Sequence, residues 1–360
     1  MKQPLFEYGP QKTPARKSFL KRHPYIINII LFVITFFTCM VAGVQWKQMN
    51  PLQLENLHAG LSYAVLILTF LTAHEFGHYI ASRIHKVDAT LPYYIPMPIP
   101  FILNFGTFGA VIKTRSPIPT KKALFDIGAA GPIAGFIVCV VYLIIGFSTL
   151  PPIDYLYEIH PEYLTQMGGK IPEHGLYFGS TILFNAMKDV VSYPDAFVPP
   201  MNEIYHYPLL NVGWFGLFVT ALNMLPIGQL DGGHITYSMF GRAHAKIARY
   251  FWGFMIALGL GGVLGMLNEF FQQEFKNLIL RGFDQILSPV LEFIGSVAPW
   301  YYEGWVGWIF WALLTKFFVK LDHPPIHSND DIGPGRRAVG WFALSILALC
   351  FSFNGIYLVE

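Results

Sequence analysis

Residues 71–80 read Leu-Thr-Ala-His-Glu-Phe-Gly-His-Tyr-Ile, inside an apolar run that extends from about 59 to 83. Residues four apart on a helix share one face, so His74 and His78 can both point at one metal ion. Zinc accepts two imidazoles together with a third protein ligand and water. Glu75 lies beside them and can take a proton from that water. Because ionisable residues inside a membrane-length run are costly and usually functional, the run predicts a metal site rather than a polar cluster at a helix end.

A second motif supplies a carboxylate for the third ligand position. Residues 223–234 read Asn-Met-Leu-Pro-Ile-Gly-Gln-Leu-Asp-Gly-Gly-His, at the end of an apolar run near 207–227. Asp231 precedes two glycines, which is also good turn chemistry, so a helix cap is the alternative interpretation. Both motifs are expected at the same membrane depth, and this favours Asp231 as a metal ligand.

The composition excludes an ordinary soluble protein. Of the 360 residues, 54% are hydrophobic and 13% are charged, whereas soluble domains contain about 25% charged residues. The net charge of +2 gives no reason to expect a nucleic-acid partner. Cys39, Cys139 and Cys350 all lie in apolar runs. We expect them to be buried apolar side chains, without a disulfide or a thiolate metal site.

Seven apolar stretches approach the length of about 20 residues that a transmembrane helix needs. They lie near 25–44, 59–83, 124–148, 207–227, 248–267, 304–319 and 338–357. Residues 284–300 are expected to form an interfacial helix or a further partial span. The predicted fold class is therefore an all-α polytopic membrane protein with about seven transmembrane helices.

The distribution of charge predicts the orientation of these spans. The tail 1–23 is basic and is expected in the cytoplasm, whereas the segment 149–205 is rich in acidic residues and is expected outside. Basic residues also follow the spans that should run inward. The expected location is a bacterial cytoplasmic membrane.

The segment 91–119 breaks the helical pattern. It contains prolines at positions 92, 96, 98 and 100, which exclude a regular helix there. Its apolar residues and glycines predict a short strand pair, that is a β-hairpin, or a re-entrant loop. Such backbone at membrane depth must be buried in protein or line a cavity.

The two motifs together resemble the site-2 protease family of intramembrane zinc metalloproteases, which pair an HExxH helix with a distant LDG motif in a core of three transmembrane helices. The resemblance covers about residues 59–235. It implies that Asp231 is the third ligand of one Zn²⁺ per chain. It also implies that Asn223 faces the site and holds the substrate backbone or oxyanion. The implied activity is that of a zinc metalloendopeptidase acting in or near transmembrane segments of membrane-protein substrates.

Residues 125–135, Phe-Asp-Ile-Gly-Ala-Ala-Gly-Pro-Ile-Ala-Gly, resemble the middle core helix of this family. Gly131 and Gly135 form a small-xxx-small pair for close helix contact, and Pro132 is able to kink a helix. We expect this helix to pack between the two metal-bearing helices. Asp126 is expected to cap its N-terminus rather than to act in catalysis.

The expected organisation has four parts. They are a basic tail (1–23), a first transmembrane helix and loop (24–58), a catalytic core (59–235) and a C-terminal transmembrane region (236–360) whose role is open. Within the core, 92–112 resembles the membrane-embedded strand region of the family, and by analogy its edge pairs with an unwound substrate segment. We expect no PDZ domain. We expect His234 either to support the ligands from outside or to have a structural role.

Two other classes of function use the same residues. A polytopic carrier would use them as a transport site, and a catalytically silent scaffold would not use them for chemistry. A glutamate adjacent to His74 favours hydrolysis over transport, and the intact set of ligands argues against the scaffold. The expected partners are a membrane-protein substrate and the lipid bilayer, while the substrate's identity and the oligomeric state are not indicated.

Overall fold

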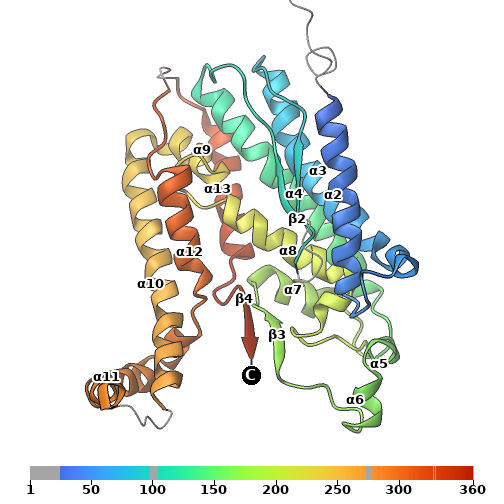
Figure 1. Cartoon of the computed structure of the whole chain (residues 1–360). Coiled ribbons are helices and arrows are strands. Elements are labelled where there is room, and N and C mark those ends of the chain that lie inside the picture. Colours follow the sequence, from blue (N-terminus) through green and yellow to red (C-terminus); the bar gives the residue numbers. More distant parts are fainter. Residues whose placement is uncertain (1–24, 98–103, 273–277, 327, 329, 360) are drawn as a thin grey trace, which may run out of the picture.

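The computed structural model describes residues 25–97, 104–272, 278–326, 328 and 330–359, so the predicted basic tail lies outside the described residues. Every stretch expected to cross the membrane contains a helix (Figure 1). These helices are α2 (Ile26–Gln45), α3 (Leu61–Ile84), α4 (Lys121–Ser148), α8 (Pro208–Asn223), α10 (His244–Phe271), α12 (Gly307–Leu314) and α13 (Pro334–Cys350). The prediction of an all-α polytopic membrane protein is confirmed.

Four described helical segments are long and apolar enough to span a membrane, namely Ile26–Gln45, Leu54–Ile84, Lys121–Ser148 and Asp231–Phe271. Two shorter apolar helices, Pro208–Asn223 and Gly307–Val319, accompany them. The number of seven spans therefore stays a prediction. The remaining helices are η1 (Leu54–Gly60), α5 (Asp154–Ile159), α6 (Pro161–Thr165), α7 (Ile182–Val191), η2 (Ile204–His206), α9 (Asp231–Phe240), η3 (Gly241–Ala243), α11 (Leu278–Val297), η4 (Pro299–Glu303) and η5 (Thr315–Val319).

The segment between α4 and α8 lies at one end of the helix bundle. Figure 1 shows α5, α6 and β3 (Gly175–Phe178) at the end opposite to the first residues of α2. The indole of Trp214, which is buried in α8, donates a hydrogen bond to the Gly179 carbonyl at 2.7 Å and stacks on Phe178. The start of α2 and the segment between α4 and α8 therefore lie at opposite ends of the bundle, and the side of the membrane on which each lies stays a prediction.

Helices α3, α4 and α8 form a core in which backbones touch. A Cβ atom at Gly77 of α3 would lie 2.5 Å from the Ala130 carbonyl oxygen and 2.9 Å from the Cα of Gly131, both in α4. On the other side of α4, a Cβ atom at Gly216 of α8 would collide with Cys139. Cys39, Cys139 and Cys350 are all buried free thiols, as expected.

The segment 91–119 forms the predicted strand pair. β1 (Tyr93–Pro96) and β2 (Thr107–Val111) are antiparallel, with Tyr93 opposite Val111. Helix α2 holds them, because the amide of Asn28 donates to the carbonyls of residues 91 and 92 at 2.9 Å and the Thr38 hydroxyl donates to the Gly106 carbonyl at 2.7 Å. The strand pair is therefore attached to the bundle rather than free at membrane depth.

Two predictions were wrong in detail. Asp126 does not cap α4, because the Thr120 hydroxyl accepts the capping hydrogen bond from the Ala123 amide at 3.1 Å. The last apolar stretch does not stay helical to 357, because the chain leaves α13 at Cys350 and then forms β4 (Ile356–Val359), which pairs with β3. Most of residues 284–300, expected to form an interfacial helix or a further partial span, lies in α11, and the structure does not separate these two alternatives.

The close contact of α3 and α4 gives the first testable prediction. Gly77→Ala should lower the free energy of unfolding by about 1–3 kcal/mol, because the added methyl group has no room. Gly253→Ala in α10 is the matched control, since a Cβ atom there meets nothing within 4 Å. Thermal unfolding in detergent with saturating zinc measures both, and equal midpoints for the two variants would contradict this packing.

Candidate metal centre

Three side chains from α3 and α9 converge on one point. The Nε2 atoms of His74 and His78 lie 3.1 Å apart, and each lies 3.4 Å from Oδ2 of Asp231. Tetrahedral zinc with ligands at about 2.0–2.1 Å requires ligand atoms roughly 3.4 Å apart. The donor set and the spacing therefore fit a zinc ion held by these three residues.

Residues of α4 orient the two imidazoles. The Ile127 carbonyl lies 2.7 Å from Nδ1 of His78. A carbonyl oxygen only accepts, so Nδ1 donates and Nε2 presents its lone pair to the centre. A Cβ atom at Gly131 would collide with the His78 ring, and one at Gly135 would lie 3.4 Å from Nδ1 of His74. The prediction that residues 125–135 pack between the metal-bearing helices is confirmed.

Asp231 is not a helix cap in this structure. It is the first residue of α9, whose N-cap position is Leu230, and no side chain makes a capping hydrogen bond there. Its carboxylate faces the two histidines instead. This geometry favours Asp231 as a metal ligand over Asp231 as a helix cap.

A cavity of about 350 Å³ opens on the three side chains. Glu75 and Asn223, the two further residues predicted at the site, both line it. Glu75 is only 6% exposed and takes part in no salt bridge within the described part of the chain. Ala110, Val111 and Ile112 at the end of β2 form a wall of the same cavity. The sheet has two described strands, so β1 pairs with one edge of β2 and no described strand pairs with the other edge.

The C-terminal region contributes contacts that sequence reasoning missed. His234 lines the cavity, and its Nδ1 lies 2.8 Å from Nε2 of His323, which follows α12 and η5. Arg336 at the start of α13 donates two hydrogen bonds to Asp126, at 2.7 and 2.8 Å. His85 also contacts Asp126, at 2.7 Å. None of these pairs has a short sequence spacing that would indicate a site.

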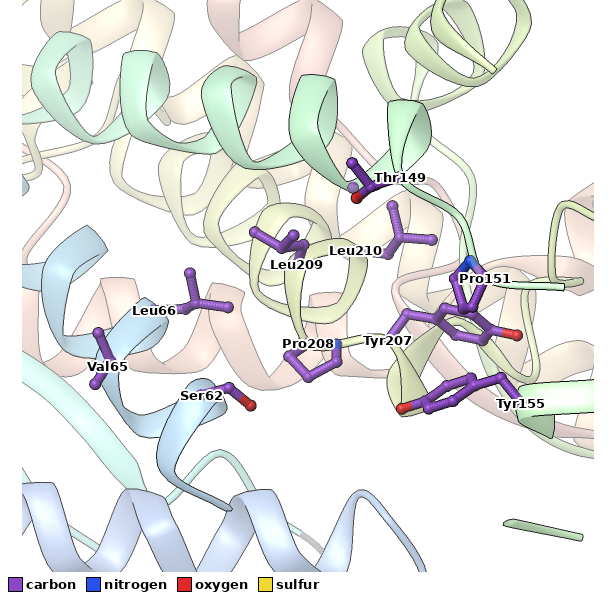
Figure 2. Close-up of a pocket in the computed structure, with 11 residues that line it drawn as sticks. Ser62, Val65, Leu66, Thr149, Pro151, Tyr155, Tyr207, Pro208, Leu209 and Leu210 are labelled. Carbon is purple, nitrogen blue, oxygen red and sulfur yellow. The ribbon is translucent and has the colours of Figure 1, made fainter. Parts of the chain in front are cut away.

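A larger cavity of about 510 Å³ lies beside the first residues of α3 and the last residues of α4. Figure 2 shows Val65 and Leu66 of α3 facing Leu209 of α8 across it, with Tyr155 and Tyr207 at one side. Its described lining contains no imidazole or carboxylate. This cavity therefore lacks the imidazole and carboxylate ligands of the first centre.

Comparisons with known proteins agree with the two motifs. Residues 62–267 match the family described as Peptidase family M50. The chain is 30% identical over 312 residues to "Probable zinc metalloprotease EGY1, chloroplastic" of Oryza sativa subsp. japonica, covering 81% of this chain and 50% of that protein. It is 29% identical over 239 residues to the EGY1 protein of Arabidopsis thaliana, covering 61% of this chain and 40% of that protein.

The chain is also 30% identical over 248 residues to "Probable zinc metalloprotease EGY2, chloroplastic" of Oryza sativa subsp. indica, covering 66% of this chain and 39% of that protein. It spans half or less of the length of these relatives. No solved structure matches the chain. Because these relatives are named as chloroplastic, they give no support to the expected bacterial membrane.

The matched region contains both motifs and the helix between them, and it covers more than half of the chain. The chain therefore belongs to Peptidase family M50, the site-2 protease family that its motifs resemble.

Proposed function

We propose that the chain is an intramembrane zinc metalloprotease that hydrolyses peptide bonds in or near the transmembrane segments of membrane-protein substrates. The observation that carries this proposal is the convergence of His74, His78 and Asp231 beside Glu75, on helices with the length and composition of membrane spans. The names of the related plant proteins, which are probable zinc metalloproteases, support the reaction class.

His74, His78 and Asp231 would hold the metal, and the Ile127 carbonyl of α4 keeps the His78 imidazole in the liganding orientation. A zinc ion at this position supplies a Lewis acid for the scissile carbonyl and an activated water. Glu75 accepts the proton of that water and returns it to the leaving nitrogen. Because Glu75 lies in the cavity without a cationic partner among the described residues, its carboxylate is available for this proton.

In this proposal, β2 and Asn223 bind the substrate. The peptide bonds of a transmembrane helix are hydrogen-bonded and hidden by side chains, so a substrate must become extended before attack. The uncovered edge of β2 offers backbone partners to such a strand beside the cavity. The Asn223 amide is a donor for the oxyanion that develops on the carbonyl, and the exposed Gln229 also lines the cavity.

The ligand assignment predicts the metal content of variants. His74→Ala and Asp231→Ala should each lose one equivalent of zinc per chain, because two remaining ligands hold the ion weakly. His85→Ala, directly after α3, is the control, since His85 pairs with Asp126 and lies outside the centre. Metal analysis of the purified proteins tests this, and unchanged zinc in the first two variants would rule out the assignment.

The role of Glu75 predicts a variant that binds zinc without turnover. Glu75→Gln keeps the size of the side chain but cannot accept the proton, so cleavage should fall at least about 100-fold. Zinc content and thermal unfolding should not change. Glu55→Gln, at an exposed position in η1, should cleave a single-span substrate at the normal rate. Near-normal turnover by zinc-loaded Glu75→Gln would disprove the mechanism.

The role of β2 predicts a variant impaired in substrate handling alone. Gly109 has a φ of +102° and Gly175 of β3 has a φ of +123°, and a Cβ atom at either meets nothing within 4 Å. Valine is strained at both positions, but only the first adjoins the cavity wall. Gly109→Val should therefore reduce cleavage while zinc stays bound, and Gly175→Val should not. Equal cleavage by both variants would argue against strand pairing.

A further inference from the structure

The segment between α4 and α8 contains a second group of ligand side chains, His160, Glu203 and His206. The two Nε2 atoms lie 2.9 Å apart, and Oε2 of Glu203 lies 3.2 Å from Nε2 of His206 and 3.9 Å from that of His160. The corresponding separations at the first centre are 3.1, 3.4 and 3.4 Å. The second group therefore has nearly the same dimensions as the first.

Hydrogen bonds on the far side of both rings fix which nitrogen faces the group. Nδ1 of His206 lies 2.6 Å from the Trp46 carbonyl, and Nδ1 of His160 lies 2.7 Å from the Glu162 carboxylate. Both partners are acceptors, so both Nδ1 atoms donate, and the Nε2 atoms of the neutral rings present lone pairs. With neutral rings, Oε2 of Glu203 and the two Nε2 atoms are three acceptor atoms that converge on one point, and they need a shared positive charge, which a metal ion or a second proton on one ring supplies.

Burial strengthens this requirement. His206 is 0% exposed and Glu203 is 1% exposed. The Tyr163 hydroxyl donates to Oε1 of Glu203 at 2.8 Å, but Oε2 has no hydrogen-bond partner among the described residues. Its ion-pair partners there are the two histidines alone. An unpaired carboxylate oxygen at this depth costs several kcal/mol, so the group requires a positive charge, and a metal ion held by all three side chains would supply it.

We propose that His160, Glu203 and His206 bind a second zinc ion, at a structural site distinct from the first centre. Two imidazoles and one carboxylate are a donor set that zinc accepts readily, and the Glu162, Tyr163 and Trp46 contacts are the outer hydrogen bonds that such ligands usually have. Because the first centre was the only site expected from the sequence, the predicted zinc content rises from one to two per chain.

The position of the group indicates a structural role. Figure 1 shows α5 and α6 far from α9, at the other end of the bundle. The metal would join the start of α6 to η2, which directly precedes α8, and His206 in turn holds the end of α2 through Trp46. Tyr155 of α5 also donates to the His206 carbonyl at 2.8 Å. The ion would therefore fasten the segment between α4 and α8 to helices α2 and α8.

Metal analysis of the 360-residue chain in detergent separates the two sites. After saturation with zinc and removal of the unbound ion, we expect about two zinc ions in the wild type, about one in His74→Ala, and none in His74→Ala/His160→Ala. His160 is the ligand to replace because its side chain is 12% exposed and its loss leaves the smallest buried defect. Zinc should also raise the unfolding temperature of His74→Ala but not that of the double variant.

Two further variants keep the test decisive. His74→Ala/Glu203→Gln should also bind no zinc, since glutamine preserves the shape of the side chain and removes its charge. His74→Ala/His174→Ala should keep one ion, because His174 is an exposed histidine of the same segment outside the group. A folded His74→Ala protein that binds no zinc, or one whose zinc survives both ligand replacements, would overturn the second site and leave the first unaffected.

Discussion

The structure depends on the burial of ionisable side chains inside apolar helices. His74, His78, Glu75 and Asp231 occupy positions where isolated charges are unfavourable by several kcal/mol. A shared cation offsets this cost only if the ligands are held at fixed distances. Helix α4 meets that condition because its glycines admit α3 and the His78 ring while the Ile127 carbonyl orients that ring. The same contacts of α4 therefore pack the bundle and position the ligands of the centre.

The sequence predicts the parts of this arrangement that depend on short spacing or on membrane depth. The four-residue spacing of His74 and His78 predicts their shared face, and the charge pattern predicts that residues 149–205 lie at the end of the bundle away from the start of α2. The sequence does not predict contacts between distant segments. The Arg336–Asp126 pair joins residues 210 positions apart, and no local pattern distinguishes Asp126 from a helix cap.

The second group, His160, Glu203 and His206, is another contact between distant segments that the sequence does not predict. His160 and His206 are 46 residues apart. His160 lies between α5 and α6, His206 lies in η2, and no liganding motif surrounds either, so the sequence gives no reason to pair them. Only the fold brings together three acceptors and an orphan carboxylate oxygen. At both ends of the bundle, buried lone pairs that converge on one point require a positive charge.

The central claim is that this centre cuts peptide bonds that lie within the membrane. Its most direct test is to incubate the purified chain with a single-span protein in lipid vesicles and to locate the cut by mass spectrometry. The account predicts a zinc-dependent cut inside the apolar segment of the substrate, absent with Glu75→Gln. Intact substrate together with zinc movement across the vesicle membrane that depends on His74 would contradict it and would identify a carrier.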